Sequence, residues 1–225
     1  MKKFYCLVLI VLVAFAACKK GQLSSGDGED NGCISRIKRD YSDSNKVELA
    51  TAIKLLQKNN IPTNGLVIYR VILNDSISTN IYQHVMAYEE SNGLPIFNSG
   101  ISYHFRNEIF ETSIGRRYGT LNLNTKAAAT LPQIRKVFID AFKKDGYTVD
   151  NNVNESSCLN AEFGYFDLNH DTPDHPNFIK AWKVTFAKYN EYPVAYIQDS
   201  DRKLLFYFNG LLTLNKVNQT GSKIR

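Results

Sequence analysis

Residues 161–212 contain four apolar runs that decide the fold: AEFGYFDL (161–168), IKAWKVTFA (179–187), PVAYIQ (193–198) and LLFYFNGLL (204–212). Aromatic and β-branched residues dominate these runs and polar residues separate them, a pattern that is typical of strands. Successive runs are joined by links shorter than the dozen or more residues that a parallel crossover needs. We therefore expect an antiparallel sheet in this part of the chain.

A second set of runs lies upstream and has the same character. Its members are LVIYRVIL (66–73), IYQHVMAY (81–88), PIFNSGISYHF (95–105) and IFETSI (109–114). Short polar segments again separate the runs, so they predict a second antiparallel sheet.

A helix is predicted ahead of each set of strands. Residues 130–146 open with a capping box of Thr130 and Gln133 and end at Gly146, a residue that favours a helix C-cap. The apolar residues of this segment recur at helical spacing, at Ile134, Val137, Phe138, Ala141 and Phe142. Residues 46–59 follow a similar capping box and predict the other helix. The order helix, strands, helix, strands predicts an α+β fold of two successive modules, each a helix packed on an antiparallel β-sheet.

The composition of the 225 residues is that of a globular protein, with 44% hydrophobic and 22% charged residues. This balance argues against intrinsic disorder. The formal net charge is +5, and the basic residues are scattered along the chain. Nucleic-acid binders concentrate a stronger positive charge on one surface, so we expect no nucleic-acid partner.

The N-terminus predicts export and a lipid anchor. Two lysines precede an apolar run at residues 4–17, which is shorter than the about 20 residues that span a bilayer and is typical of a signal peptide. The run ends in AAC (16–18), which resembles the lipobox where bacterial lipoproteins are cleaved and lipidated. We predict a signal peptide at residues 1–17 and a lipid on Cys18. Cleavage by an ordinary signal peptidase and an uncleaved segment are the alternatives.

Residues 19–32 are almost wholly polar and contain four glycines, which predicts a flexible tether over residues 18–45 after the lipidated Cys18. Acyl chains on that cysteine would hold the protein on a membrane outside the cytoplasm. The predicted location is the cell envelope, as an outer-membrane lipoprotein that is periplasmic or surface-exposed.

Two of the four cysteines remain unmodified after this predicted processing. Cys6 departs with the signal peptide and Cys18 carries lipid, so Cys33 and Cys158 remain. An even number of thiols in an oxidising compartment favours a disulfide, and two separate thiols are the alternative.

Several stretches of the chain resemble the propeptides of thermolysin- and fungalysin-type metalloproteases. Residues 88–100, YEESNGLPIFNSG, are similar to the FTP module, whose hallmark is an aromatic strand ending in Gly-Leu-Pro-Val-Phe. Residues 181–184 (AWKV), 192–199 (YPVAYIQD) and 202–205 (RKLL) are similar to the PepSY module that follows it in those propeptides.

This resemblance implies a cystatin-like or PepSY-like fold for each module. It places an FTP-like module at residues 46–125, a PepSY-like module at residues 126–215 and a C-terminal tail at residues 216–225. In the family, the propeptide assists folding of the adjoining protease and blocks its cleft. The resemblance therefore implies a peptidase as the partner.

The chain lacks the motifs of common catalytic sites. It contains no HExxH zinc helix, no G-x-S-x-G nucleophile elbow and no glycine-rich phosphate loop. We therefore expect no enzymatic activity and no cofactor. His84 and His104 fall within predicted strands, where we interpret them as half-buried sheet residues rather than catalytic bases.

One polar loop, HDTPDH (170–175), is a candidate metal site. Imidazole and carboxylate groups suit a divalent cation such as zinc, and the candidate ligands are His170, Asp171, Asp174 and His175. The alternative is an ordinary solvated loop, which the two prolines in and after the segment favour.

Taken together, these patterns predict a non-catalytic, membrane-anchored interaction module outside the cytoplasm, which inhibits or chaperones a peptidase or binds another envelope protein. Exposed aromatic residues anchor protein partners well, so Trp182, Tyr192 and Tyr196 are the candidate contacts. For Trp182, packing in the core is the alternative. A lipoprotein that binds a small ligand or metal, and a structural envelope protein, are the other functional hypotheses.

Overall fold

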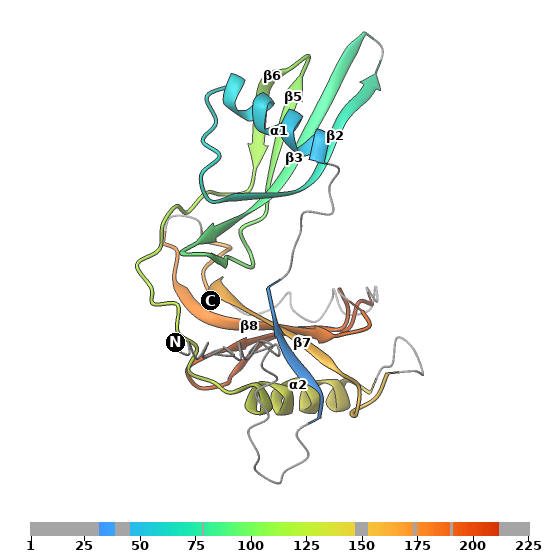
Figure 1. The fold of residues 1–225 in the computed structure, drawn as a ribbon, viewed down its shortest axis with the longest axis vertical. Helices are drawn as coiled ribbons and strands as arrows, with labels where there is room; N and C mark the ends of the chain where they lie inside the picture. Colours follow the sequence, from blue (N-terminus) through green and yellow to red (C-terminus); the bar gives the residue numbers. More distant parts are fainter. Residues whose placement is uncertain are drawn as a thin grey trace, which may run out of the picture. The chain divides into compact units, whose positions relative to one another are not determined.

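The structure is a computed structural model, and it describes residues 32–38, 46–77, 79–146, 153–172, 175–189 and 191–211. These residues form two helices and ten strands (Figure 1). The helices are α1 (Lys46–Lys58) and α2 (Leu131–Asp145). The strands are β1 (Ile34–Ile37), β2 (Leu66–Ile77), β3 (Asn80–Ser91), β4 (Leu94–Pro95), β5 (Ile101–Arg106), β6 (Ile109–Ile114), β7 (Leu159–Asp167), β8 (Phe178–Phe186), β9 (Val194–Gln198) and β10 (Leu204–Phe208).

Sheet A has the strand order β1-β7-β8-β9-β10. Neighbouring strands are antiparallel except β1 and β7, which are parallel. Alternate residues of each strand point to opposite faces, and one face packs against α2. That core contains Phe138 from α2, Phe163 from β7, Trp182 and Phe186 from β8 and Ile197 from β9.

Sheet B has the order β2-β3-β5-β6, and β4 pairs with β3 outside this path. All of its neighbouring strands are antiparallel. Its buried face shares a core with α1, in which Leu56 meets Val85, Tyr103 and Phe105. The edge strand β6 differs from its neighbours because all six of its residues are exposed.

The predicted α+β fold of two helix-on-sheet modules is wrong. Strand accounts for 43% of the structure and helix for 16%, so the protein is mostly β-sheet, with two helices and two sheets. The prediction treated each short helix as a complete layer of the fold. The prediction also lacks β1, which joins sheet A in parallel from residues within the predicted tether.

The helix predicted at residues 130–146 is present as α2, and its ends follow local chemistry. The Gln133 side chain accepts a hydrogen bond from the Thr130 backbone N–H at 3.0 Å. Gly146 has φ 66° and donates its N–H to the Phe142 carbonyl. This left-handed conformation is cheap for glycine, so the helix ends there. The capping residue Asn45 of the other predicted helix lies outside the described residues.

The segment after β4 contacts β7 and so joins the two sheets. The Phe97 N–H donates to the Tyr165 carbonyl at 2.9 Å. The Asn98 side chain donates to the Asp167 carbonyl at 2.8 Å and accepts from the Asp167 N–H at 3.0 Å. A Cβ at Gly164 would lie 2.4 Å from the Pro95 oxygen, so only glycine allows this approach.

Candidate functional site: an aromatic face on sheet A

Six aromatic side chains gather on the face of sheet A that points away from α2. The cross-strand partners show the side they take: Phe206 lies opposite Tyr196, and Tyr196 lies opposite Lys183. Ala195 and Ile197, which alternate with Tyr196 along β9, belong to the core under α2. We call this surface the aromatic face, and it consists of Phe97, Phe166, Tyr192, Tyr196, Phe206 and Phe208.

The rings of the aromatic face form a continuous series centred on Tyr196. Its ring centroid lies 5.5 Å from that of Phe97, 5.2 Å from that of Phe166 and 6.2 Å from that of Phe206. Phe206 is followed by Phe208 at 6.4 Å, and Phe208 by Tyr192 at 5.2 Å. Ring pairs at these separations attract one another, so the side chains are held in place before any partner binds.

The outer part of this face is open to solvent. Phe206 is 49% exposed and Tyr192 is 42% exposed, whereas the other four rings are half-buried. Both exposed rings lie on or beside β10, one of the two edge strands of sheet A. Among the described residues, no strand pairs with the outer edge of β10. Exposed rings beside an open edge offer both apolar anchors and backbone hydrogen-bonding groups.

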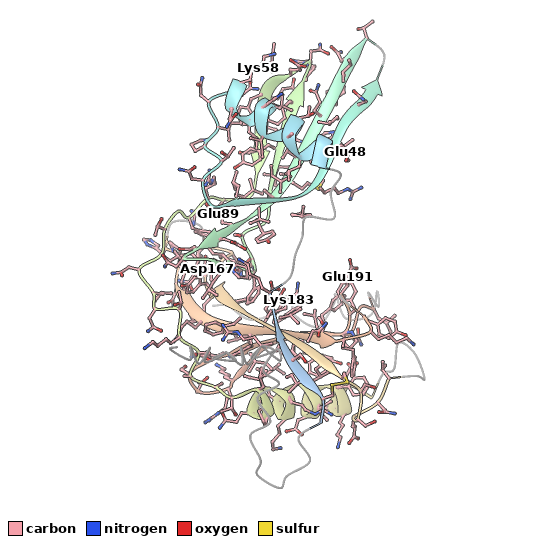
Figure 2. The ribbon with its side chains drawn as sticks, in the orientation of Figure 1. Glu48, Lys58, Glu89, Asp167, Lys183 and Glu191 are labelled. Atoms are coloured by element: carbon pink, nitrogen blue, oxygen red, sulfur yellow. A yellow bond between two sulfur atoms is a disulfide. The ribbon has the colours of Figure 1, made fainter. Side chains whose placement is uncertain are left out.

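Charged side chains flank the rings. Glu162 is buried and lies directly opposite Lys183 on the neighbouring strand, on the same face. Figure 2 shows Lys183 and Glu191 on the side of sheet A away from α2. The aromatic face is therefore an apolar centre with charged groups beside it, which is the usual anatomy of a protein-binding surface.

The structure separates the three aromatic residues predicted as partner contacts. Tyr192 and Tyr196 are members of the aromatic face. Trp182 is only 2% exposed and lies on the opposite face, in the core under α2. Its indole N–H donates to Asp199 at 2.9 Å. Trp182 therefore stabilises the sheet and is not available to a partner.

The predicted metal loop receives no support from the described residues. His170 and Asp171 form a surface pair with Nε2 and Oδ1 3.0 Å apart, and both are exposed. His175 is exposed as well, and Asp174 lies outside the described residues. No three His, Cys, Asp or Glu side chains within the described ranges are grouped closely enough to hold a metal ion.

Sequence reasoning missed the almost completely buried carboxylates, among them Glu89, Asp167 and Asp199. Glu89 accepts hydrogen bonds from the backbone of Tyr118 and from Arg117, whose Nε lies 3.0 Å away. Asp167 accepts from the N–H groups of Asn169 and Asn177 at 3.0 and 2.7 Å. Figure 2 labels Glu89 and Asp167. Since hydrogen-bond donors of the protein already occupy these oxygens, we interpret the groups as structural.

Asp199 is the clearest example of such a structural carboxylate. It accepts backbone N–H bonds from Ala128 at 2.8 Å and Ala129 at 3.0 Å, besides the bond from the Trp182 indole. Lys180 Nζ lies 3.5 Å away. Burial alone raises the pKa of Asp199, but these hydrogen bonds and the lysine charge outweigh burial and lower the pKa below its usual value. Asp199 is therefore charged at neutral pH and fixes the segment that leads into α2.

A disulfide joins Cys33 to Cys158, the pair indicated by the sequence, with Cα atoms 4.4 Å apart. It lies beside the parallel pairing of β1 with β7, where the Leu159 N–H donates to the Cys33 carbonyl at 2.8 Å. The bond therefore holds β1 on the edge of sheet A. Cys18, the predicted lipidation site, lies outside the described residues.

The chain matches no protein-family profile and shows no significant similarity to a curated protein. The resemblance to metalloprotease propeptides therefore stays a hypothesis that depends on the motifs themselves. Neither helix in the described part of the chain is long and apolar enough to cross a membrane.

Proposed function

We propose that this protein is a non-catalytic interaction module, anchored to a membrane outside the cytoplasm, whose aromatic face binds another protein. The observation that carries the proposal is the series of six rings with Phe206 and Tyr192 exposed at its outer end. A soluble protein gains nothing from exposing large rings side by side unless something covers them. A partner that covers them removes apolar surface from water and finds side chains already ordered.

A protein fits this surface better than a small molecule does. The rings spread over β7, β9, β10 and two loops, and the open edge of β10 offers backbone groups to an extended segment of a partner. The resemblance to protease propeptides favours a peptidase as that partner. Inhibition or assisted folding of a thermolysin-type metallopeptidase is the activity that we propose for the complex.

The binding test compares two double substitutions of exposed apolar residues. Phe206→Ala with Tyr192→Ala removes the exposed rings of the aromatic face. Ile109→Ala with Ile114→Ala is the control, since these residues are 68% and 67% exposed on β6 of the other sheet. Truncating two aromatic anchors costs about 2–4 kcal/mol, so the first variant should bind a thermolysin-type peptidase of the same cell at least tenfold more weakly.

Peptidase inhibition and surface plasmon resonance both give the dissociation constant. The control variant should bind as the wild type does. Equal weakening by both variants would mean that the aromatic face is not the contact. Turnover of peptide, ester or glycoside substrates by the purified protein would contradict the non-catalytic part of the proposal.

The anchor has a separate test. Cys18→Ala removes the only thiol at the end of the apolar run and should release the protein from the membrane, because no acyl chain can then be attached. Fractionation with detergent phase separation measures this. A variant that partitions into detergent as fully as the wild type would rule out lipidation at Cys18.

A further inference from the structure

The direction of the backbone groups along β10 follows from those of its neighbour β9. Just after β9, the Asp199 N–H donates to β8, whereas at the end of β9 the Gln198 N–H donates to Lys203, next to β10. Successive residues of a strand direct their N–H and C=O groups to opposite sides. Tyr196 therefore points its backbone groups toward β10, and Ala195 points its groups toward β8.

Tyr207 consequently directs its N–H and C=O away from the sheet. Phe206 lies opposite Tyr196, whose groups face it, but Tyr207 lies opposite Ala195, whose groups point the other way. No strand pairs with this edge of β10 in the part of the chain that the structure describes, and no described loop bonds to the Tyr207 backbone. The edge therefore offers one donor and one acceptor to an extended chain.

An irregularity between Leu204 and Phe206 limits how much of this edge can be paired. A bulge interrupts the regular spacing of the ladder, so regular pairing begins at Phe206 and runs through Phe208. Side chains that lie opposite these two residues on an added strand fall on the same side of the sheet as their rings, which is the aromatic face. Since Phe206 is 49% exposed, apolar side chains at those positions would cover it.

The turn before β10 adds charge to this end of the edge. Arg202 and Lys203 are exposed, and neither forms an ion pair with a described residue. Asp201 accepts the Lys203 backbone N–H at 3.1 Å, so the exposed part of the turn holds two cations against one carboxylate. Opposite charges across an interface speed association and select the partner, so the turn favours an acidic segment over a basic one.

We propose that the partner binds here as an added strand. An extended segment pairs antiparallel with β10 at Tyr207. It places apolar side chains opposite Phe206 and Phe208 and a carboxylate beside Lys203. Antiparallel pairs are slightly more stable than parallel ones, and this direction puts the carboxylate at the C-terminal end of the segment. The inference rests on the proposed function, because the segment belongs to the peptidase that binds the aromatic face.

Hydrogen exchange measures the pairing directly. The full chain, purified in detergent, is compared with and without a thermolysin-type peptidase of the same cell, made inactive by replacing the glutamate of its HExxH motif. In the free protein, the Tyr207 amide should exchange fast, and the complex should slow it at least tenfold. The exposed edge strand β6, at residues 109–114, is the internal control and should exchange equally in both states.

Two substitutions of Tyr207 separate its backbone from its side chain. Tyr207→Ala and Tyr207→Pro remove the same ring, but only proline also removes the N–H. Proline suits an edge strand where the N–H points outward, so both variants should fold with similar stability, which circular dichroism checks. Tyr207→Pro should bind the peptidase at least tenfold more weakly than Tyr207→Ala in surface plasmon resonance.

A charge reversal tests the carboxylate of the segment. Lys203→Glu should weaken binding at least threefold. Lys54→Glu makes the same change of charge at an exposed position of α1, on the other sheet, and should leave the affinity within twofold of the wild type. Equal weakening by both variants would contradict the acidic segment.

The results that overturn the added strand differ from those that overturn the proposed function. A complex without protection of residues 204–211, or equal binding by the two Tyr207 variants, contradicts the added strand and leaves the aromatic face as the contact. Slow exchange of Tyr207 in the free protein also contradicts it, and protection that grows with protein concentration would assign the edge to a second copy. Failure of the peptidase to bind at all contradicts both proposals. Exchange in the wild type decides even if Tyr207→Pro does not fold.

Discussion

Sheet A and sheet B are built on different amounts of core. Among the described residues, the cluster under α2 contains thirteen buried residues, five of them aromatic, whereas the cluster under α1 contains nine, two of them aromatic. Sheet A is also closed by the disulfide from Cys33 to Cys158. Sheet B ends instead in β6, whose residues are all exposed.

The outward faces of the two sheets also differ. Sheet A presents a series of packed rings to solvent, and sheet B presents a pair of imidazoles, His84 and His104, with half-buried polar neighbours. The larger and more aromatic core of sheet A can hold large rings in fixed positions, which a protein-binding surface needs. We infer that sheet A carries the partner surface and that sheet B is the less stable half. The predictions below test this difference.

The largest expected effect is on the core of sheet A. Trp182→Ala should lower the free energy of unfolding by about 4–5 kcal/mol, because it leaves a large cavity and removes a donor from the buried Asp199. Phe105→Ala in sheet B should cost about 3 kcal/mol, since its neighbour Phe110 is 38% exposed and can move to fill the space. Urea denaturation followed by circular dichroism measures both. A greater loss for Phe105→Ala would reverse the comparison.

Removing the disulfide should have the second largest effect on the free energy of unfolding. Replacing Cys33 and Cys158 together by serine frees a loop of 125 residues and should cost about 2–4 kcal/mol. The disulfide lies beside the pairing of β1 with β7, so removing it also weakens the attachment of β1 to sheet A. The loop that it closes contains every strand of sheet B. Urea denaturation of the variant should match that of the wild type in reductant. A cost below about 1 kcal/mol would mean that β1 stays paired without the bond.

Acid should act on sheet A through Asp199. Its pKa is lowered in the folded protein, so it contributes stability above its unfolded pKa, near 4, and this stability is lost as the pH falls through the lower folded value. Asp199→Asn should lower the free energy of unfolding by about 1–3 kcal/mol at neutral pH. It should also remove part of the decrease in stability at low pH. Asp140→Asn on the exposed side of α2 is the control and should change little. Thermal unfolding between pH 3 and pH 7 measures both. Parallel pH profiles for Asp199→Asn and the wild type would contradict this role.

Local patterns in the sequence predict much of the secondary structure. Helix α2, its glycine C-cap and the main strands all follow from residue types within a few positions of one another. The disulfide partners followed from counting cysteines. β1 was missed because its four residues, ISRI, are too few to show a period, and their pairing partner β7 is far along the chain.

The site could be predicted only in part, because the register of the strands decides which of its side chains lie on the same face. Tyr192 and Tyr196 were expected to contact a partner, but the face that Phe206 takes depends on an irregularity in the pairing between Leu204 and Phe206. The same limit applies to the buried carboxylates. Asp199 finds backbone donors 71 and 70 residues away, and no local pattern contains that information.

The smallest expected effect is on β6. Ile109→Thr with Ile114→Thr should change the free energy of unfolding by less than about 0.5 kcal/mol, because both side chains are more than half exposed and lose little burial. Threonine keeps the β-branched shape that suits a strand, so backbone pairing with β5 should persist. The same variant should bind the peptidase as the wild type does, whereas Phe206→Thr, which also changes stability little, should not. Urea denaturation and surface plasmon resonance on the same samples separate these outcomes. A loss above about 1 kcal/mol on β6 would mean that its exposed residues stabilise sheet B and that the two halves differ less than their cores indicate.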